Sequence, residues 1–161
     1  MFIKPTSLSI KRKVLWTTLL ILIILSLLFI FSHSTLSTEE VSAESGTVEE
    51  IIEEILPPDS PVTEEVTNNM DKVGHFGEFF ILGVFCALFV GFFSLKRLPA
   101  VFSSMLFAQL VAFSDETLQM FTGRYADVVD MWFDVFGFAA ASIVIYLLFW
   151  LAKGVKGIKE R

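Results

Sequence analysis

The chain has 161 residues, enough for one domain, but its composition is far from that of a soluble protein. Hydrophobic residues make up 54% of it, charged residues only 19%, and there are 18 phenylalanines, which excludes a large soluble domain. The net charge is -6, so we expect no nucleic acid among its partners, and the single Cys86 excludes an intramolecular disulfide.

Four stretches are long and apolar enough to cross a bilayer, which requires roughly 20 residues per helical span. Because backbone groups in hydrocarbon must bond within their own segment, we expect helices rather than strands. The stretches are Val14 to Phe31, Phe76 to Phe93, Pro99 to Leu118 and Trp132 to Leu151. The sequence therefore predicts an all-α polytopic membrane bundle of four transmembrane helices, with the lipid bilayer as its main partner.

Residues 1–33 combine a basic start with the first apolar stretch. This region also resembles a signal peptide, because the small residues Val41, Ser42 and Ala43 follow it. However, the apolar run is longer than the about 7 to 15 residues of a signal peptide, and the small residues come well after its end. We therefore expect a retained membrane anchor.

Residues 34–70 are expected to form an acidic extracytoplasmic loop, since no Lys or Arg occurs between Ser32 and Asp71. Within this loop, apolar residues recur at helical spacing and predict a short amphipathic helix that ends before Pro57. They are Val48, Ile51, Ile52, Ile55 and Leu56. Such a helix would either lie on the membrane surface or cap the bundle.

The distribution of positive charge predicts the orientation of the chain. Ten of the twelve Lys and Arg residues lie before the first stretch, between the second and third, or in the tail 153–161. These places are on one side of a four-span chain, and the positive-inside rule puts them in the cytoplasm. We expect a multi-pass protein of the cytoplasmic membrane with both termini cytoplasmic, in which residues 71–152 form a three-helix core.

Three of the expected helices each bring a stripe of polar side chains to the same outer level of the membrane. Residues spaced i, i+3 or i+4 share one side of a helix. An ionised carboxylate within an apolar stretch costs roughly 3 kcal/mol or more unless it is paired. We take this set as the candidate ligand-binding site, and it consists of Asp71, Lys72, His75, Glu78, Asp115, Glu116, Gln119, Arg124, Asp127, Asp130 and Asp134.

His75, Asp115 and Glu116 are the candidates for catalysis, because imidazole and carboxylate groups in one place can act as acids and bases. The set holds seven carboxylates against two fixed cations, so not all of them can be buried and ionised. Several are protonated, some face water, or the site holds a divalent cation. For Asp71 and Asp130, at helix starts, capping of free backbone amides is an equally good interpretation.

Small residues indicate where the helices pack closely. Gly83, Ala87 and Gly91 lie four residues apart on the second stretch, and Gly137 and Ala141 do the same on the fourth. Each set predicts a face on which a neighbouring helix can approach closely.

Taken in order, the polar residues resemble the VanZ family of bacterial membrane proteins, which is named for a teicoplanin-resistance protein. The resemblance covers residues 71 to about 140, and an Asn is expected in place of Asp134. It implies a bacterial cytoplasmic membrane and a link to glycopeptide or lipoglycopeptide susceptibility, but it supplies no reaction. The motifs that carry it are Asp71-Lys72-x-x-His75-Phe76, Asp115-Glu116-x-x-Gln119, Arg124, Asp127, Asp130 and Gly137.

Three functions remain open at this point, and the sequence does not decide whether the protein is an enzyme. The first is an envelope-modulating protein that binds an amphiphile, such as a lipid-linked wall precursor or a lipoglycopeptide. The second is a small, metal-dependent membrane enzyme acting on a lipid-linked substrate. The third is a structural bundle without a ligand. A metal dependence would separate the second from the others, and a bound head group would separate the first from the third.

Overall fold

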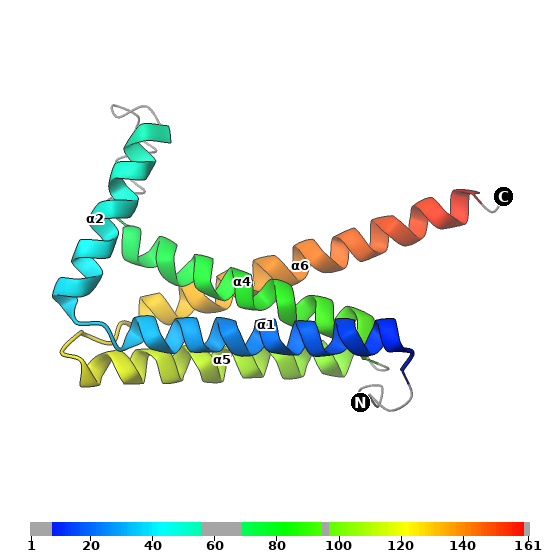
Figure 1. Ribbon diagram of the computed structural model, residues 1–161, viewed down its shortest axis with the longest axis horizontal. Helices are drawn as coiled ribbons and strands as arrows, with labels where there is room; N and C mark the ends of the chain where they lie inside the picture. Colours follow the sequence, from blue (N-terminus) through cyan, green and yellow to red (C-terminus); the bar gives the residue numbers. More distant parts are fainter. Residues whose placement is uncertain (1–7, 56–68, 95–96, 160–161) are drawn as a thin grey trace.

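The computed structural model describes residues 8–55, 69–94 and 97–159 (Figure 1). In this part of the chain it contains α1 (Ile10–Ser34), α2 (Thr38–Ile55), α4 (Met70–Phe93), α5 (Arg97–Phe121) and α6 (Val128–Lys159). The prediction of an all-α fold is confirmed. Leu56 and Pro57, on which the predicted end of the amphipathic helix rests, lie outside the described residues, as do Lys4, Lys96 and Arg161 among the basic residues counted above.

Within the described part of the chain, α1, α4, α5 and α6 are the four helices long and apolar enough to cross a membrane, as predicted. The helices are longer than the apolar stretches that predicted them. Helix α4 begins at Met70, next to the helix start expected at Asp71 and ahead of the apolar stretch that starts at Phe76. Helix α5 ends at Phe121, beyond the apolar stretch that ends at Leu118. Most of the predicted polar residues therefore lie on the end turns of these helices, where their positions are fixed by the helical backbone.

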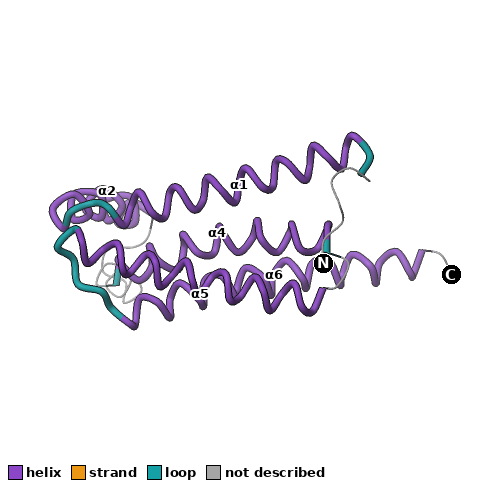
Figure 2. The backbone as a smooth tube through the Cα atoms, turned by 90° about the horizontal axis from the view of Figure 1, so that it is seen from below, coloured by secondary structure: helices purple, strands orange, loops and turns teal. Residues whose placement is uncertain are grey.

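The ends of α1 and α5 and the starts of α4 and α6 lie together at one end of the bundle, which we call the polar end (Figure 1). At the opposite end, α6 continues beyond the other helices (Figures 1 and 2). Helices α4 and α6 pack against each other most extensively, while α1 packs on α4 and α5, and α5 packs on α6. All four membrane helices thus meet at the polar end.

Small residues allow α4 and α6 to approach closely. A Cβ atom added at Gly83 would lie 2.8 Å from the backbone oxygen of Phe138, and one added at Gly137 would lie 2.2 Å from the backbone oxygen of Phe76. Both neighbouring atoms belong to the backbone, so they cannot move aside unless the helices separate. The predicted close approach at these two glycines is confirmed.

Away from the polar end, the interior of the bundle is largely apolar, and so is most of its outer surface. Large apolar side chains such as Leu106, Phe113 and Ile143 are exposed, as expected for helices surrounded by lipid. Cys86 is buried and serves as a packing residue. The main buried cluster draws on all four membrane helices and consists of Ile30, Phe79, Leu82, Cys86, Ala108, Val111, Ala112 and Phe138.

Helix α2 is the predicted amphipathic helix, although at 18 residues it is longer than expected. At its start, Glu40 accepts hydrogen bonds from the backbone N–H and the hydroxyl of Ser37, at 2.8 and 2.7 Å. These bonds, the backbone one foremost, lower the pKa of the Glu40 carboxyl. Val41 is buried near the start of α2, and the rest of the helix points away from the bundle (Figure 1).

Candidate functional site

One histidine and three carboxylates from three helices converge at the polar end. They are His75 on α4, Asp115 and Glu116 on α5, and Asp134 on α6, and all four residues are buried. One potential ligand atom from each side chain lies within 4.8 Å of those of the other three. We call these four residues the polar cluster.

Hydrogen bonds connect the polar cluster to every membrane helix. Nδ1 of His75 lies 2.9 Å from Oδ1 of Asp134 and 3.6 Å from Oδ2 of Asp115. The hydroxyl of Ser34, at the end of α1, donates to Oδ1 of Asp115. Gln119, one turn further along α5, donates from Nε2 to Oδ2 of Asp115 at 3.2 Å. The contacts therefore fix Asp115 through donors from two different helices.

Two oxygens of the polar cluster have no hydrogen-bond partner among the described residues. Glu116 accepts the backbone N–H of Asp127 with Oε2 at 2.8 Å, but its Oε1 is buried without a partner. Oδ2 of Asp134 is also buried without a partner. Among the described side chains, no Lys or Arg lies within ion-pair distance of these carboxylates. Among the described residues, His75 is therefore the potential cation in ion-pair contact with the polar cluster's carboxylates.

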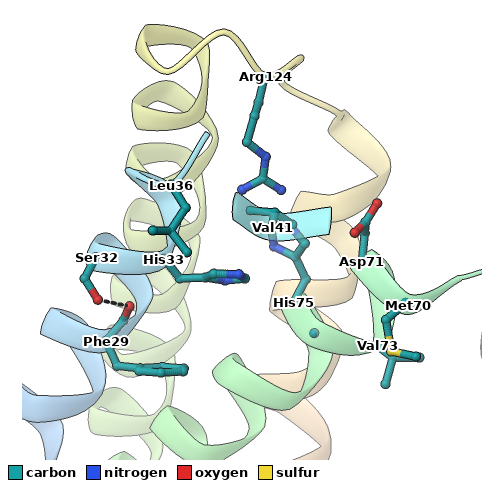
Figure 3. Close-up of a pocket in the computed structure, with 11 residues that line it drawn as sticks. Phe29, Ser32, His33, Leu36, Val41, Met70, Asp71, Val73, His75 and Arg124 are labelled. Atoms are coloured by element: carbon teal, nitrogen blue, oxygen red, sulfur yellow. Dashed lines mark hydrogen bonds between the residues drawn. The ribbon is translucent and has the colours of Figure 1, made fainter. Parts of the chain in front are cut away.

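A glycine turn positions Arg124 beside the polar cluster. After α5, Gly123 adopts a positive φ of 82°, and the backbone N–H of Arg124 donates to the carbonyl of Gln119 at 3.2 Å. The guanidinium points from the α5–α6 loop toward His75 (Figure 3). Its Nη1 atom is buried and has no hydrogen-bond partner in the described part of the chain.

A cavity of about 390 Å³ lies next to the polar cluster, bordered by α1, α2, α4 and the α5–α6 loop (Figure 3). Its walls are largely apolar, with a few polar side chains among them. His75 belongs both to this cavity and to the polar cluster. The other lining residues are Phe29, Ser32, His33, Leu36, Val41, Met70, Asp71, Val73, Gly74 and Arg124.

Glu78 has a partner outside the polar cluster. It was expected on the same side of its helix as His75, but its Oε1 lies 2.6 Å from Nδ1 of His33 on α1. Sequence reasoning missed both His33 and the neighbouring Ser34, which together tie α1 to the site. The available signal was the polar sequence Ser32-His33-Ser34 directly after the first apolar stretch.

The remaining predicted residues lie around the polar cluster. Asp127 caps α6, because its Oδ1 accepts the backbone N–H of Val129 at 2.8 Å. This is the role considered for Asp130, which instead is half-buried, with Oδ1 lacking a partner. Asp71 is exposed and lines the cavity, and Lys72 beside it on α4 is half-buried.

The comparisons with known proteins identify the family. The model of the VanZ/LLP1 family matches residues 17–150. No match was found among curated proteins or solved structures. The matched region includes most of α1 and extends beyond residues 71 to about 140, on which the resemblance was based. Since the match covers much more than half of the chain, the protein belongs to the VanZ/LLP1 family.

Proposed function

We propose that the protein binds the anionic head group of an amphiphile in the cavity at the polar end. The observation that supports this most strongly is Arg124, whose Nη1 is buried without a partner and whose guanidinium points toward His75 in the cavity (Figure 3). A guanidinium forms its strongest hydrogen bonds with phosphate or carboxylate groups. A ligand with such a group would supply the acceptor that the described residues do not provide.

The size and surroundings of the cavity favour a head group with a lipid tail. Its volume of about 390 Å³ is that of a small ligand site, and apolar residues such as Phe29, Leu36 and Val73 form much of its wall. It lies where the membrane helices end, so a tail would remain in the bilayer. Lipid-linked wall precursors and lipoglycopeptides both combine an apolar tail with anionic groups. Binding either would modulate the cell envelope or glycopeptide susceptibility at the extracytoplasmic face.

A matched pair of probes tests the proposal. Binding of a polyprenyl monophosphate and of the corresponding uncharged polyprenol is measured on the purified protein by native mass spectrometry. We expect Arg124→Ala to weaken binding of the phosphate roughly tenfold to a hundredfold, the effect of losing a charge-assisted hydrogen bond of about 1.5 to 3 kcal/mol. Binding of the polyprenol should not change.

Arg12→Ala is the control variant. Arg12 is also a membrane-interface arginine, but it donates to the carbonyl of Phe92 at 2.9 Å at the opposite end of the bundle. Its removal should leave phosphate binding unchanged. Equal affinity of the wild-type protein for phosphate and polyprenol, or undiminished binding by Arg124→Ala, would refute the proposal and favour a structural bundle without a ligand.

A membrane enzyme acting on a lipid-linked substrate is the second candidate. It is favoured by one observation, that His75 lines the cavity while its Nδ1 contacts the buried Asp134. A histidine oriented by a carboxylate can act as a general acid or base toward a bound substrate. Release of inorganic phosphate from the polyprenyl monophosphate, abolished by His75→Ala, would identify hydrolysis. Binding without release would support the first proposal.

A further inference from the structure

We infer that the polar cluster is a binding site for one divalent metal ion, held by His75, Asp115, Glu116 and Asp134. Among the described residues, only His75 is common to the polar cluster and the cavity, so ion binding in the cluster does not rest on the proposed amphiphile binding. It is carried by the geometry of the four side chains and by the oxygens that the described residues leave without partners.

The four side chains are already close to the spacing that a metal ion requires. Their ligand atoms lie within 4.8 Å of one another. Around an ion with bonds of about 2.0 to 2.4 Å, two opposite ligand atoms are about 4.0 to 4.8 Å apart. Small side-chain movements would therefore bring all four into contact with one ion. The ligands come from α4, α5 and α6, so the bundle fixes their positions before an ion binds.

The unpaired oxygens are an independent indication of a missing partner. Asp134 is 0% exposed and Glu116 is 3% exposed, yet Oδ2 of Asp134 and Oε1 of Glu116 accept no hydrogen bond. Buried polar atoms in native proteins nearly always have a partner. Since no described Lys or Arg forms an ion pair with the cluster, a divalent cation would supply both the missing contacts and the missing positive charge.

The carboxylates of the polar cluster accept hydrogen bonds of the kind that orient metal ligands in proteins. Ser34 and Gln119 donate to the two oxygens of Asp115, and the backbone N–H of Asp127 donates to Oε2 of Glu116. Such donors fix the ligand carboxylates and leave another lone pair or oxygen free to bind the ion. In Glu116, the oxygen that remains free is Oε1, the buried atom without a partner.

The ligand types indicate which ions fit. Three carboxylates and one imidazole suit Zn²⁺ or Mn²⁺, which accept nitrogen and oxygen ligands together. Ca²⁺ and Mg²⁺ bind almost entirely through oxygen. We therefore assign the site to a transition metal of the Zn²⁺ or Mn²⁺ type.

The test measures metal content directly on the full chain. The protein is purified in mild detergent, stripped with a chelator, incubated with excess Zn²⁺ or Mn²⁺, desalted and analysed for metal per chain. We expect one ion per chain for the wild type, and at least a tenfold loss of affinity for Asp134→Asn and Glu116→Gln. Glu78→Gln is the matched control, because Glu78 is a carboxylate at the same end of the bundle that pairs with His33 outside the cluster. It should retain one ion.

Thermal unfolding of the same samples separates loss of the site from loss of the fold. Glu116→Gln removes a buried charge that no described Lys or Arg pairs with, so without metal it should be at least as stable as the wild type. Asp134→Asn keeps an oxygen that can accept a hydrogen bond from Nδ1 of His75, so it should remain folded. Added metal should raise the unfolding temperature of the wild type and of Glu78→Gln, but not that of the two cluster variants. The assignment would be overturned if the wild type bound neither ion, or if the two cluster variants bound metal as well as the wild type. An equal loss of metal affinity in all three variants, Glu78→Gln included, would also overturn it.

Discussion

Replacing Gly137 with alanine tests how closely α4 and α6 must approach to form the polar cluster. The added Cβ would lie 2.2 Å from the backbone oxygen of Phe76, whereas ordinary contact begins at 3.4 Å, so the helices must separate locally by about 1.2 Å. His75 directly precedes Phe76, and Asp134 lies one turn before Gly137. The same separation would therefore lengthen the 2.9 Å contact between the side chains of His75 and Asp134.

We expect Gly137→Ala to lower the free energy of unfolding by about 1 to 3 kcal/mol through overpacking. The lost hydrogen bond would add roughly 1 kcal/mol. Stability can be measured by reversible unfolding in mixed micelles, followed by circular dichroism.

Gly77→Ala is the control, because it makes the same change on α4 with no atom within 4 Å of the added Cβ. It should be neutral, or stabilising by up to about 1 kcal/mol, since alanine favours the helix. If both variants unfold at the same denaturant concentration, the close contact between α4 and α6 at Gly137 is wrong.

Two further predictions concern the orientation of the chain and the start of α2. In a Cys86→Ala background, a cysteine replacing Tyr125, which is 95% exposed, should react with a membrane-impermeant thiol reagent in intact spheroplasts. A cysteine replacing Ser94 should react only after permeabilisation, and the reverse pattern would place the polar end in the cytoplasm. Because the folded-state pKa of Glu40 is lowered, its bonds to Ser37 stabilise the start of α2 above the ordinary pKa, and this contribution is lost as pH falls through the lowered value. Ser37→Ala should return the pKa of Glu40 toward its ordinary value in an NMR titration, and an unchanged titration would contradict this account.

The membrane helices could be predicted from sequence because lipid imposes both their length and their apolar composition. Their ends needed a second signal, because an apolar window stops at the first polar residues, and that signal was the helical spacing of the polar side chains. Asp71 and Gln119 lie outside the predicted stretches but on turns of α4 and α5. Backbone hydrogen bonding continues through these residues, and they are polar because the helices end near water and the candidate site.

Helical spacing placed the polar residues on faces but could not show which helix each face meets. Glu78 follows His75 by three residues, a rotation that leaves the two side chains about 60° apart around α4. In a four-helix bundle, two side chains that point in directions this different face different neighbouring helices. His75 contacts Asp134 on α6, whereas Glu78 contacts His33 on α1. Such pairings depend on how the helices are arranged around one another, and the residue spacing within one helix does not reveal that arrangement.

The separation of charges at the polar end argues against a purely structural role. A clamp that only held helices together would pair Arg124 with a nearby carboxylate, because an unpaired buried charge is costly. In the described structure, Nη1 of Arg124, Oε1 of Glu116 and Oδ2 of Asp134 are all buried without hydrogen-bond partners. The guanidinium instead points toward His75 in the cavity (Figure 3). The carboxylates of the polar cluster converge on one another. These unpartnered atoms support both proposals, an anion bound beside Arg124 and a cation bound within the polar cluster.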